Sequence, residues 1–436
     1  MDHVILTVGR NELPVLVAAY RLCAQSRKLP RFSVLHSAQT APEAARVREA
    51  LERRLTAEGR IGNDDRLHWV AGDDERVDES YPSSIQLAVS KIIASAPAAR
   101  QPDYSFHLHH TGGTTAMGVY ALQELLRSQY KPGSADPRYR VESSYLAGRD
   151  HLLRDHGGAI LTPPGTDERH YWDLLVEDLA KLHGYEATCR QEPAPGLIEA
   201  SVRMSQIVVD PAHGEAYDTW LRRVWEPQRR QQVVWVNLNA PDWMEITAAI
   251  AANLHPEKAW LSRTSGRWTA NPAALGKNEH RHVDQFLHHQ FLELLAVRQL
   301  RLALTHLTCN PTTVRHSMTA KQPGKTSHEV DVVAVCGYQL LVVSCTFSSE
   351  FAKLKAFEVI HRARQVGGSH ARAIIICNQT AEKARQITDE LKDDVASPEY
   401  HVEVWGHDVI QNPDEMRDRF MNYLLEKMSW GTEADI

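Results

Sequence analysis

Two acidic residues in the last third of the sequence form a pattern suited to phosphodiester chemistry. Asp331 lies inside an apolar run that reads as a strand, and Glu293 lies on an apolar helical run before it. Mg²⁺ and Mn²⁺ prefer oxygen ligands, and such an ion activates water and neutralises charge on a phosphate. This pattern predicts a metal site at Glu293 and Asp331. The alternative interpretation is that Asp331 and Glu329 form a solvated strand edge.

The elements that would position these carboxylates follow an α-β-β-β-α-β order. A turn at Cys336-Gly337-Tyr338 joins two of the strands as a hairpin. A glycine pair at Gly367-Gly368 ends the second helix. The expected elements are helices at 281–299 and 353–365, and strands at 305–309, 329–335, 340–345 and 373–377.

A second pattern with chemical potential is the run Thr111-Gly112-Gly113-Thr114-Thr115. It follows a strand-like alternation at 104–109 and precedes helical spacing at 116–126. The glycines allow close approach of the backbone, and threonine hydroxyls beside helix N-terminal amides suit an anionic ligand. The alternative is an ordinary strand-to-helix turn with a threonine N-cap.

The first 110 residues alternate between strands and helices, which predicts an open parallel α/β sheet. Gly9, Arg10 and Asn11 follow the first strand, so they and Thr111–Thr115 would both lie at strand carboxyl ends, where such sheets bind ligands. Arg10 as a surface residue and Asn11 as a helix cap are the alternatives. The expected strands are 4–8, 32–36 and 67–71, and the expected helices are 13–23, 42–58 and 83–94.

This N-terminal part resembles the CRISPR-associated Rossmann fold (CARF) sensor domain. The resemblance rests on the opening 4–11, on Thr111-Gly112-Gly113-Thr114 and on 142–149. It implies a homodimer that binds a cyclic oligoadenylate across its two-fold axis, and an even ring such as cyclic tetra-adenylate suits that symmetry. Thr115 stands where the family usually has a basic residue. The implied ligand-binding residues are Gly9, Arg10, Asn11, Thr111, Gly112, Gly113, Thr114 and Thr115.

The C-terminal part is similar to the PD-(D/E)XK nuclease superfamily, in the form fused to CARF sensors in type III CRISPR systems. The matching segments are 291–293, 328–332, 341–345, 353–355 and 362–368. The family ends its second hairpin strand in acidic-x-lysine or serine-cysteine-lysine, whereas this chain has Ser344-Cys345-Thr346. In the superfamily such a lysine can migrate to the next helix, where Lys353 and Lys355 are the candidates; the alternative is a domain that binds DNA or RNA without cutting it. The implied catalytic residues are Asp331, Glu293, Ser344, Lys353 and Lys355, with Asp331 and Glu293 as metal ligands.

The region between these parts carries seven of the ten tryptophans. Trp220 to Trp225 with Arg229-Arg230 mixes aromatic and basic groups, as a nucleic-acid surface does. An amphipathic helix with a solvated rim is the alternative. Residues 231–238 read as a strand, and the region receives no functional assignment.

Composition limits the remaining possibilities. The 436 residues carry a net charge of -6, so any contact with nucleic acid must be local. Six scattered cysteines without a CxxC pair indicate a reducing compartment. The N-terminus shows no signal segment and no apolar run is long enough to span a membrane, so we expect a cytoplasmic protein. His107 and His109 share one strand face, but a zinc site needs three or four ligands.

The sequence therefore predicts an α/β protein with a CARF sensor domain at 1–155, a mixed middle region at 156–272 and a PD-(D/E)XK nuclease-like domain at 273–436. The expected function is a metal-dependent nuclease, activated by cyclic oligoadenylate, that cleaves DNA or RNA in type III CRISPR defence. Two alternatives stay open. The first is a messenger-binding scaffold with an inactive nuclease domain, and the second is a ring nuclease that degrades the messenger in the CARF pocket.

Overall fold

The chain folds into two compact α/β units. The structure is a computed structural model that describes residues 1–62, 67, 69–96, 103–130, 136–147, 150–164, 166–208, 250–264, 267–270, 274–346, 352–394 and 402–430. The first unit contains Met1–Glu186 and Gln365–His370, and the second contains Ala187–Arg364 and Ala371–Ile436. The expected middle region is thus divided between the units after Glu186. Its Trp220–Trp225 segment, Arg229-Arg230 and the strand expected at 231–238 lie outside the described residues.

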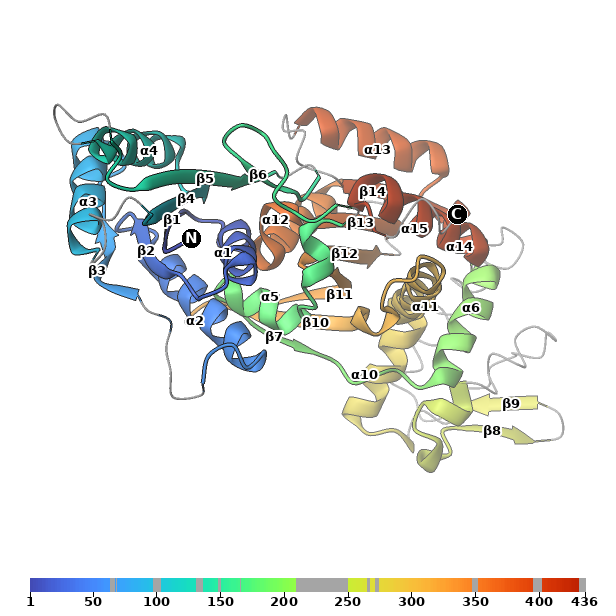
Figure 1. Ribbon diagram of the computed structural model, residues 1–436. Helices are drawn as coiled ribbons and strands as arrows, with labels where there is room; N and C mark the ends of the chain where they lie inside the picture. Colours follow the sequence, from blue (N-terminus) through green and yellow to red (C-terminus); the bar gives the residue numbers. More distant parts are fainter. Residues whose placement is uncertain are drawn as a thin grey trace. The chain divides into compact units, whose positions relative to one another are not determined.

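The first unit is built on a six-stranded sheet in the order β3-β2-β1-β4-β5-β6 (Figure 1). All neighbouring strands are parallel except β5 and β6. The open parallel sheet predicted for this part is therefore confirmed. The strands are β1 (His3–Val8), β2 (Arg31–His36), β3 (Trp69–Arg76), β4 (Ser105–Gly112), β5 (Arg140–Leu146) and β6 (Leu153–Asp155).

Helices cover both faces of this sheet (Figure 1). α3 and α4 pack against each other, and their buried side chains form one apolar cluster with Ile5, Phe106 and Leu108 of the strands. α1 and α2 contact each other on the opposite face. These helices are α1 (Leu13–Gln25), α2 (Ala41–Ala57), α3 (Pro82–Ser95) and α4 (Thr115–Gln129).

The strand order changes direction at β1, which has β2 on one side and β4 on the other. Open α/β sheets bind ligands outside the carboxyl ends of the strands at such a point. β1 ends one residue before Gly9, and its Val8 is aligned with Gly112 of β4. The fold therefore brings Gly9–Asn11 and Thr111–Thr115 to the same edge of the sheet.

A buried ion pair attaches the chain after β6 to α1. The side chain of Glu168, in the short helix η1 (Glu168–Tyr171), is fully buried and pairs with Arg21 at 3.0 Å. The hydroxyl of Thr162 donates to the same carboxylate at 2.7 Å, and the Arg21 guanidinium stacks on the Tyr171 ring at 3.5 Å. These contacts make the segment after residue 155 part of the first unit. It continues into α5 (Val176–Leu182).

The second unit contains a six-stranded mixed sheet in the order β14-β13-β12-β11-β10-β7. β11 is antiparallel to both of its neighbours, β10 and β12, and β12, β13 and β14 are parallel. Gly337, at a φ of 62°, turns β11 into β12, because glycine adopts this left-handed conformation without strain. The strands are β7 (Glu186–Cys189), β10 (Arg315–Lys321), β11 (His328–Cys336), β12 (Gln339–Thr346), β13 (Arg372–Cys377) and β14 (Val402–Trp405).

The core of the second unit surrounds α11 (Phe291–His306), which packs against α6 (Pro195–Val208) and α15 (Pro413–Met428). Trp260 and Trp405 are buried in the same cluster. Further elements of this unit are α10 (Lys277–Gln285), η5 (Phe286–Gln290), α12 (Ala352–Gly367), α13 (Ala381–Asp394), α14 (His407–Gln411) and the hairpin of β8 (Leu261–Thr264) and β9 (Arg267–Ala270).

One predicted element is wrong. The segment 305–309, expected as a strand, instead holds the last two residues of α11, which ends at His306, and the turn after it; the first strand of the motif, β10, begins at Arg315. Leu300, Leu304 and Leu307 are all fully buried, so the apolar residues continue at helical spacing into this segment. The α-β-β-β-α-β order itself is confirmed. Among the described residues, no helix has both the length and the apolar character needed to cross a membrane.

Removing the carboxylate of Glu168 tests whether the buried pair stabilises the first unit. We expect Glu168→Ala to lower the free energy of unfolding by about 3 kcal/mol, because Arg21 remains buried without its partner. Urea unfolding of the full chain, followed by tryptophan fluorescence, measures this change. Glu49→Ala is the control, since Glu49 pairs with Lys181 at 3.1 Å with both side chains more than half exposed. Equal losses from both variants would contradict a special role for the buried pair.

Candidate functional site

A cavity of about 390 Å³ in the second unit brings the predicted carboxylates together. Glu293 of α11, Asp331 of β11 and Lys355 of α12 all line it. Three different elements thus direct one cationic and two acidic groups into one polar space. The cavity also has two arginines on its lining, Arg190 and Arg362.

Asp331 is fixed by two hydrogen bonds from the neighbouring strand. Its Oδ2 accepts from the Ser344 hydroxyl at 2.8 Å and from the Cys345 backbone N–H at 2.7 Å. Burial raises the pKa of Asp331, and the charge of Glu293 raises it further. The two hydrogen bonds and the charge of Lys355 act in the opposite direction. A bound cation would relieve the repulsion between the two carboxylates.

Glu293 is oriented by histidines. His316 Nε2 lies 2.9 Å from Glu293 Oε2, and both side chains are buried. His289 Nε2 lies 3.9 Å from the other carboxylate oxygen. Gln285, His289 and Glu293 are spaced four residues apart along the helical run through η5 into α11, so they share one face of it, and all three line the cavity. Neither histidine was predicted as a neighbour of Glu293. The spacing of four residues on one helix could have pointed to His289, whereas His316 lies on β10 and meets Glu293 only through tertiary packing.

The residues present fit a divalent cation with few protein ligands. Among the described residues, no group of three or more histidines, cysteines or acidic residues is arranged to hold a metal ion. Mg²⁺ is commonly bound by one or two carboxylates, with water and substrate phosphate completing its coordination. Glu293 and Asp331 match that donor set.

The two candidate lysines lie in different environments. Lys355 lines the cavity, whereas Lys353 is not among the described lining residues and pairs with Glu390 of α13 at 3.0 Å. Residues two positions apart on a helix face in different directions, which explains the separation. Thr346, where the predicted motif would have its lysine, also lines the cavity. Ser344 contacts Asp331 rather than the cavity.

In the first unit, the glycines of the predicted ligand loops fill a packing role. A Cβ atom on Gly9 would lie 2.0 Å from the Gly112 carbonyl oxygen, and one on Gly112 would lie 1.9 Å from the Val15 side chain. A Cβ on Gly113 would lie 2.6 Å from Thr7. Real atoms do not approach so closely, so these glycines let the ends of β1 and β4 pack together.

The threonines and polar residues of these loops have defined partners. Thr114 is the N-cap of α4, and its side chain accepts from Met117 N at 3.3 Å. Thr111 Oγ1 accepts from Leu146 N at 2.7 Å. Arg10 donates to Gln39 on the surface, and Asn11 donates to Ser369 at 2.6 Å. Thr115 is exposed at the first turn of α4.

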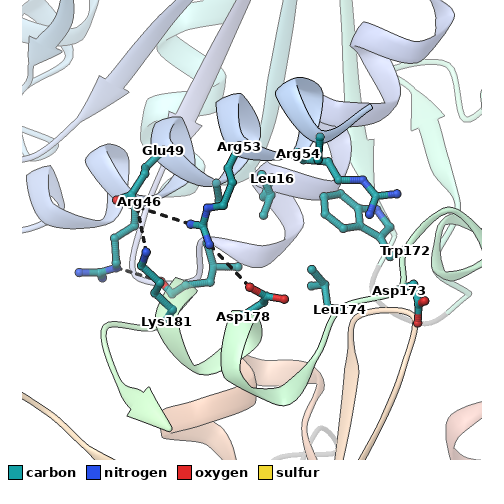
Figure 2. A pocket seen from close by; sticks show the side chains of 13 residues that line it. Leu16, Arg46, Glu49, Arg53, Arg54, Trp172, Asp173, Leu174, Asp178 and Lys181 are labelled. Atoms are coloured by element: carbon teal, nitrogen blue, oxygen red, sulfur yellow. Dashed lines mark hydrogen bonds and ion pairs between the residues drawn. The ribbon is translucent and has the colours of Figure 1, made fainter. Parts of the chain in front are cut away.

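A second cavity, of about 280 Å³, lies between α2 and α5 of the first unit (Figure 2). Trp172, Leu16 and Leu174 form part of its apolar lining. Its charged groups pair with one another, with Arg53 3.6 Å from Asp178 and Lys181 3.1 Å from Glu49. None of the predicted ligand residues is among its described lining residues. This cavity is therefore separate from the predicted messenger site.

The two histidines noted on one strand face are buried beside β5. His107 Nε2 lies 2.7 Å and His109 Nδ1 lies 3.2 Å from the hydroxyl oxygen of Ser144. His109 Nε2 is buried without a hydrogen-bond partner among the described residues. Burial, and then the nearby His107 and His110, lower the pKa of His109. The pair is therefore a buried polar cluster, and the described residues add no further metal ligand to it.

Comparison with known proteins finds similarity only at the level of structure. No model of a known protein family matches the chain, and no curated protein matches it. Protein VC1899 from Vibrio cholerae has a similar fold, with a TM-score of 0.63 and 11% identity over 99% of both chains. At that identity the similarity concerns the fold alone.

A second solved structure is described as a type III CRISPR defence DNA nuclease activated by cyclic oligoadenylate. The alignment covers 86% of this chain and 45% of the nuclease chain, with a TM-score of 0.45 and 16% identity. A TM-score at this level does not establish a common fold.

Acidification tests the buried state of His109. A histidine whose pKa is lower in the folded state takes up a proton on unfolding when the pH is below about 6.5, the pKa of a free histidine. The free energy of unfolding therefore falls as the pH drops below that value. We expect the free energy of unfolding to decrease between pH 7.5 and pH 5.5, and the decrease to be smaller in His109→Gln. Urea unfolding at the two pH values gives both quantities. An identical pH dependence in the wild type and the variant would contradict this assignment.

Proposed function

We propose that this protein is a metal-dependent nuclease of type III CRISPR defence that is activated by a cyclic oligoadenylate. The observation that carries the proposal is the convergence of Glu293, Asp331 and Lys355 in one cavity of an α-β-β-β-α-β unit. The Rossmann-like first unit, with two candidate loops at its topological switch point, supports a sensor role. Its activator is cyclic tetra-adenylate, and its substrate is DNA or RNA.

Glu293 and Asp331 would hold Mg²⁺ or Mn²⁺. Such an ion supplies an activated water and neutralises charge on the scissile phosphate. His316 keeps the Glu293 carboxylate in place, and Ser344 and Cys345 keep that of Asp331 in place. Neither carboxylate has to reorganise when substrate binds, which is the preorganisation that electrostatic catalysis requires.

Lys355 takes the part of the lysine that is missing at Thr346. Lys355 lines the cavity from α12, its ammonium group lies 3.6 Å from Glu358, and its charge lowers the pKa of Asp331. There it can orient the attacking water and stabilise negative charge that develops on the phosphate. The positive charge would thus come from helix α12 and not from the hairpin strand β12, where Thr346 lies.

In the first unit, Arg10 provides a surface cation for a phosphate, and Asn11 an amide for a base or ribose edge. Thr111–Thr115 adds amide groups at the start of α4. Gly9, Gly112 and Gly113 hold these loops close together. A ring-shaped ligand bound here would be shared by two copies of the chain.

Exposed apolar residues on α3 and α4 support a homodimer. Leu87 is 60%, Val119 54% and Leu126 48% exposed, and the two helices are neighbours. Exposed apolar patches mark protein interaction sites. Because α4 begins in the candidate ligand loop, a second copy bound here would link dimer formation to the messenger site.

Cleavage assays test the nuclease directly. We expect cleavage of supercoiled plasmid, single-stranded DNA or RNA only with Mg²⁺ or Mn²⁺ and cyclic tetra-adenylate together. Asp331→Ala should lower the rate about 10³-fold, because it removes a metal ligand, and leave messenger binding unchanged. Cleavage that persists in Asp331→Ala would reject this active site. Messenger binding without any cleavage would favour a regulatory scaffold, which the absent lysine at Thr346 also suggests.

The two lysines provide a matched comparison. Lys355→Ala should lower kcat about 10²-fold, because a charge directed at the reacting phosphate is lost. Lys353→Ala should leave kcat near the wild-type value, since that side chain pairs with Glu390. Single-turnover cleavage with saturating metal and messenger measures both. The reverse ranking would assign the catalytic lysine to position 353.

A further inference from the structure

One serine beside the cavity has an unusual backbone conformation. Ser317 lies within β10 and has a φ of 52°, in the left-handed region that residues other than glycine seldom adopt. The residues around it keep a regular register, with His316 aligned with Val332 and Met318 with Val330. Strain of this kind persists only where surrounding contacts enforce it, and it concentrates at functional sites.

The contacts of Ser317 converge on Arg190. The Ser317 carbonyl accepts a hydrogen bond from the Arg190 backbone N–H at 3.2 Å. The Ser317 hydroxyl donates to Glu329 Oε1, and the same oxygen pairs with Arg190 Nη2 at 3.0 Å. The backbone and the guanidinium of Arg190 are therefore both held by this part of the sheet.

These contacts place two guanidinium groups at the carboxylate cavity. Arg190 and Arg362 both line it together with Asp331. Arg362 Nη1 donates to the backbone carbonyl of Glu329 at 2.8 Å, so the arginines approach Glu329 through its side chain and its backbone respectively. Glu329 lies two residues before Asp331 on β11, which puts both side chains on the same face of the strand.

We propose that Arg190 is a substrate-binding residue that contacts a backbone phosphate of the nucleic acid next to the scissile phosphate. The inference rests on the proposed nuclease function and adds a residue outside the predicted motif. A guanidinium binds phosphate oxygens in a bidentate manner. The Arg190 side chain is 43% exposed and that of Glu329 is 49% exposed. Exposed ion pairs contribute little to stability, so replacing the Glu329 carboxylate by a phosphate as the partner of Arg190 costs little free energy.

Fluorescence anisotropy with the full chain tests this without relying on cleavage. The probes are a labelled oligodeoxynucleotide and an oligoribonucleotide of the same sequence, measured in EDTA with cyclic tetra-adenylate and KCl between about 50 and 200 mM. We expect Arg190→Ala to weaken binding about tenfold for the preferred probe. The slope of log K against log salt should decrease by about 0.7 to 0.9, the value for one lost phosphate contact. Arg190→Lys should retain the slope and lose part of the affinity.

Arg417→Ala is the matched control. Arg417 also pairs with carboxylates, Asp414 at 3.0 Å and Asp418 at 2.8 Å, and it does not belong to the described cavity lining. Its substitution changes the net charge by the same amount, so affinity and salt slope should stay at wild-type values. Equal effects from Arg190→Ala and Arg417→Ala would show only a general charge effect and overturn the inference.

A scan with single methylphosphonate linkages identifies the contact itself. An uncharged linkage at the contacted position should weaken binding by the wild type and have no further effect on Arg190→Ala. Additive losses at every position would overturn the assignment of Arg190. Failure of the nuclease proposal is a separate result, because it appears as absent cleavage by the wild type, whereas this measurement reports binding alone.

Discussion

The proximity of two carboxylates in one partly enclosed cavity is the constraint on which the second unit depends. Burial and the charge of Glu293 both raise the pKa of Asp331, and the opposing contributions come from two hydrogen bonds and Lys355. Two such groups remain close only if the surrounding protein fixes them. The hairpin β11–β12 fixes one, and the pair of Glu293 with His316 fixes the other.

The catalytic groups that the proposal needs are distributed over a helix, a hairpin strand and a second helix. Asp331 and Glu293 could be proposed from the sequence because one lies inside an apolar strand and the other on the preceding helix, and because both fall in segments that resemble the nuclease motif. It left Lys353 and Lys355 undecided, because the choice depends on the phase of α12 and on Glu390 of α13. Positions that depend on packing between distant elements leave no mark in local spacing, and His316 and Arg190 are further examples.

In the first unit, too, local sequence predicted the elements but not the contacts between them. The βα alternation predicted the sheet and the edge where Gly9–Asn11 and Thr111–Thr115 meet. The reason for the glycines was only partly accessible, since their close contacts are with one another and with Thr7 and Val15. The strand expected at 305–309 failed because a short apolar run fits a helix end as well as a strand.

The net charge of the chain differs from the local charge of the cavity. With a net charge of -6, the protein as a whole does not attract nucleic acid. Arg190, Arg362 and Lys355 nevertheless line the cavity that contains Glu293 and Asp331. With Glu329, which also lines the cavity, the described lining carries three cationic and three acidic side chains. A divalent cation on Glu293 and Asp331 would make this lining net positive, so a phosphate backbone would be attracted more strongly after the metal has bound. Substrate affinity and metal occupancy would then be thermodynamically linked, and each would strengthen the other.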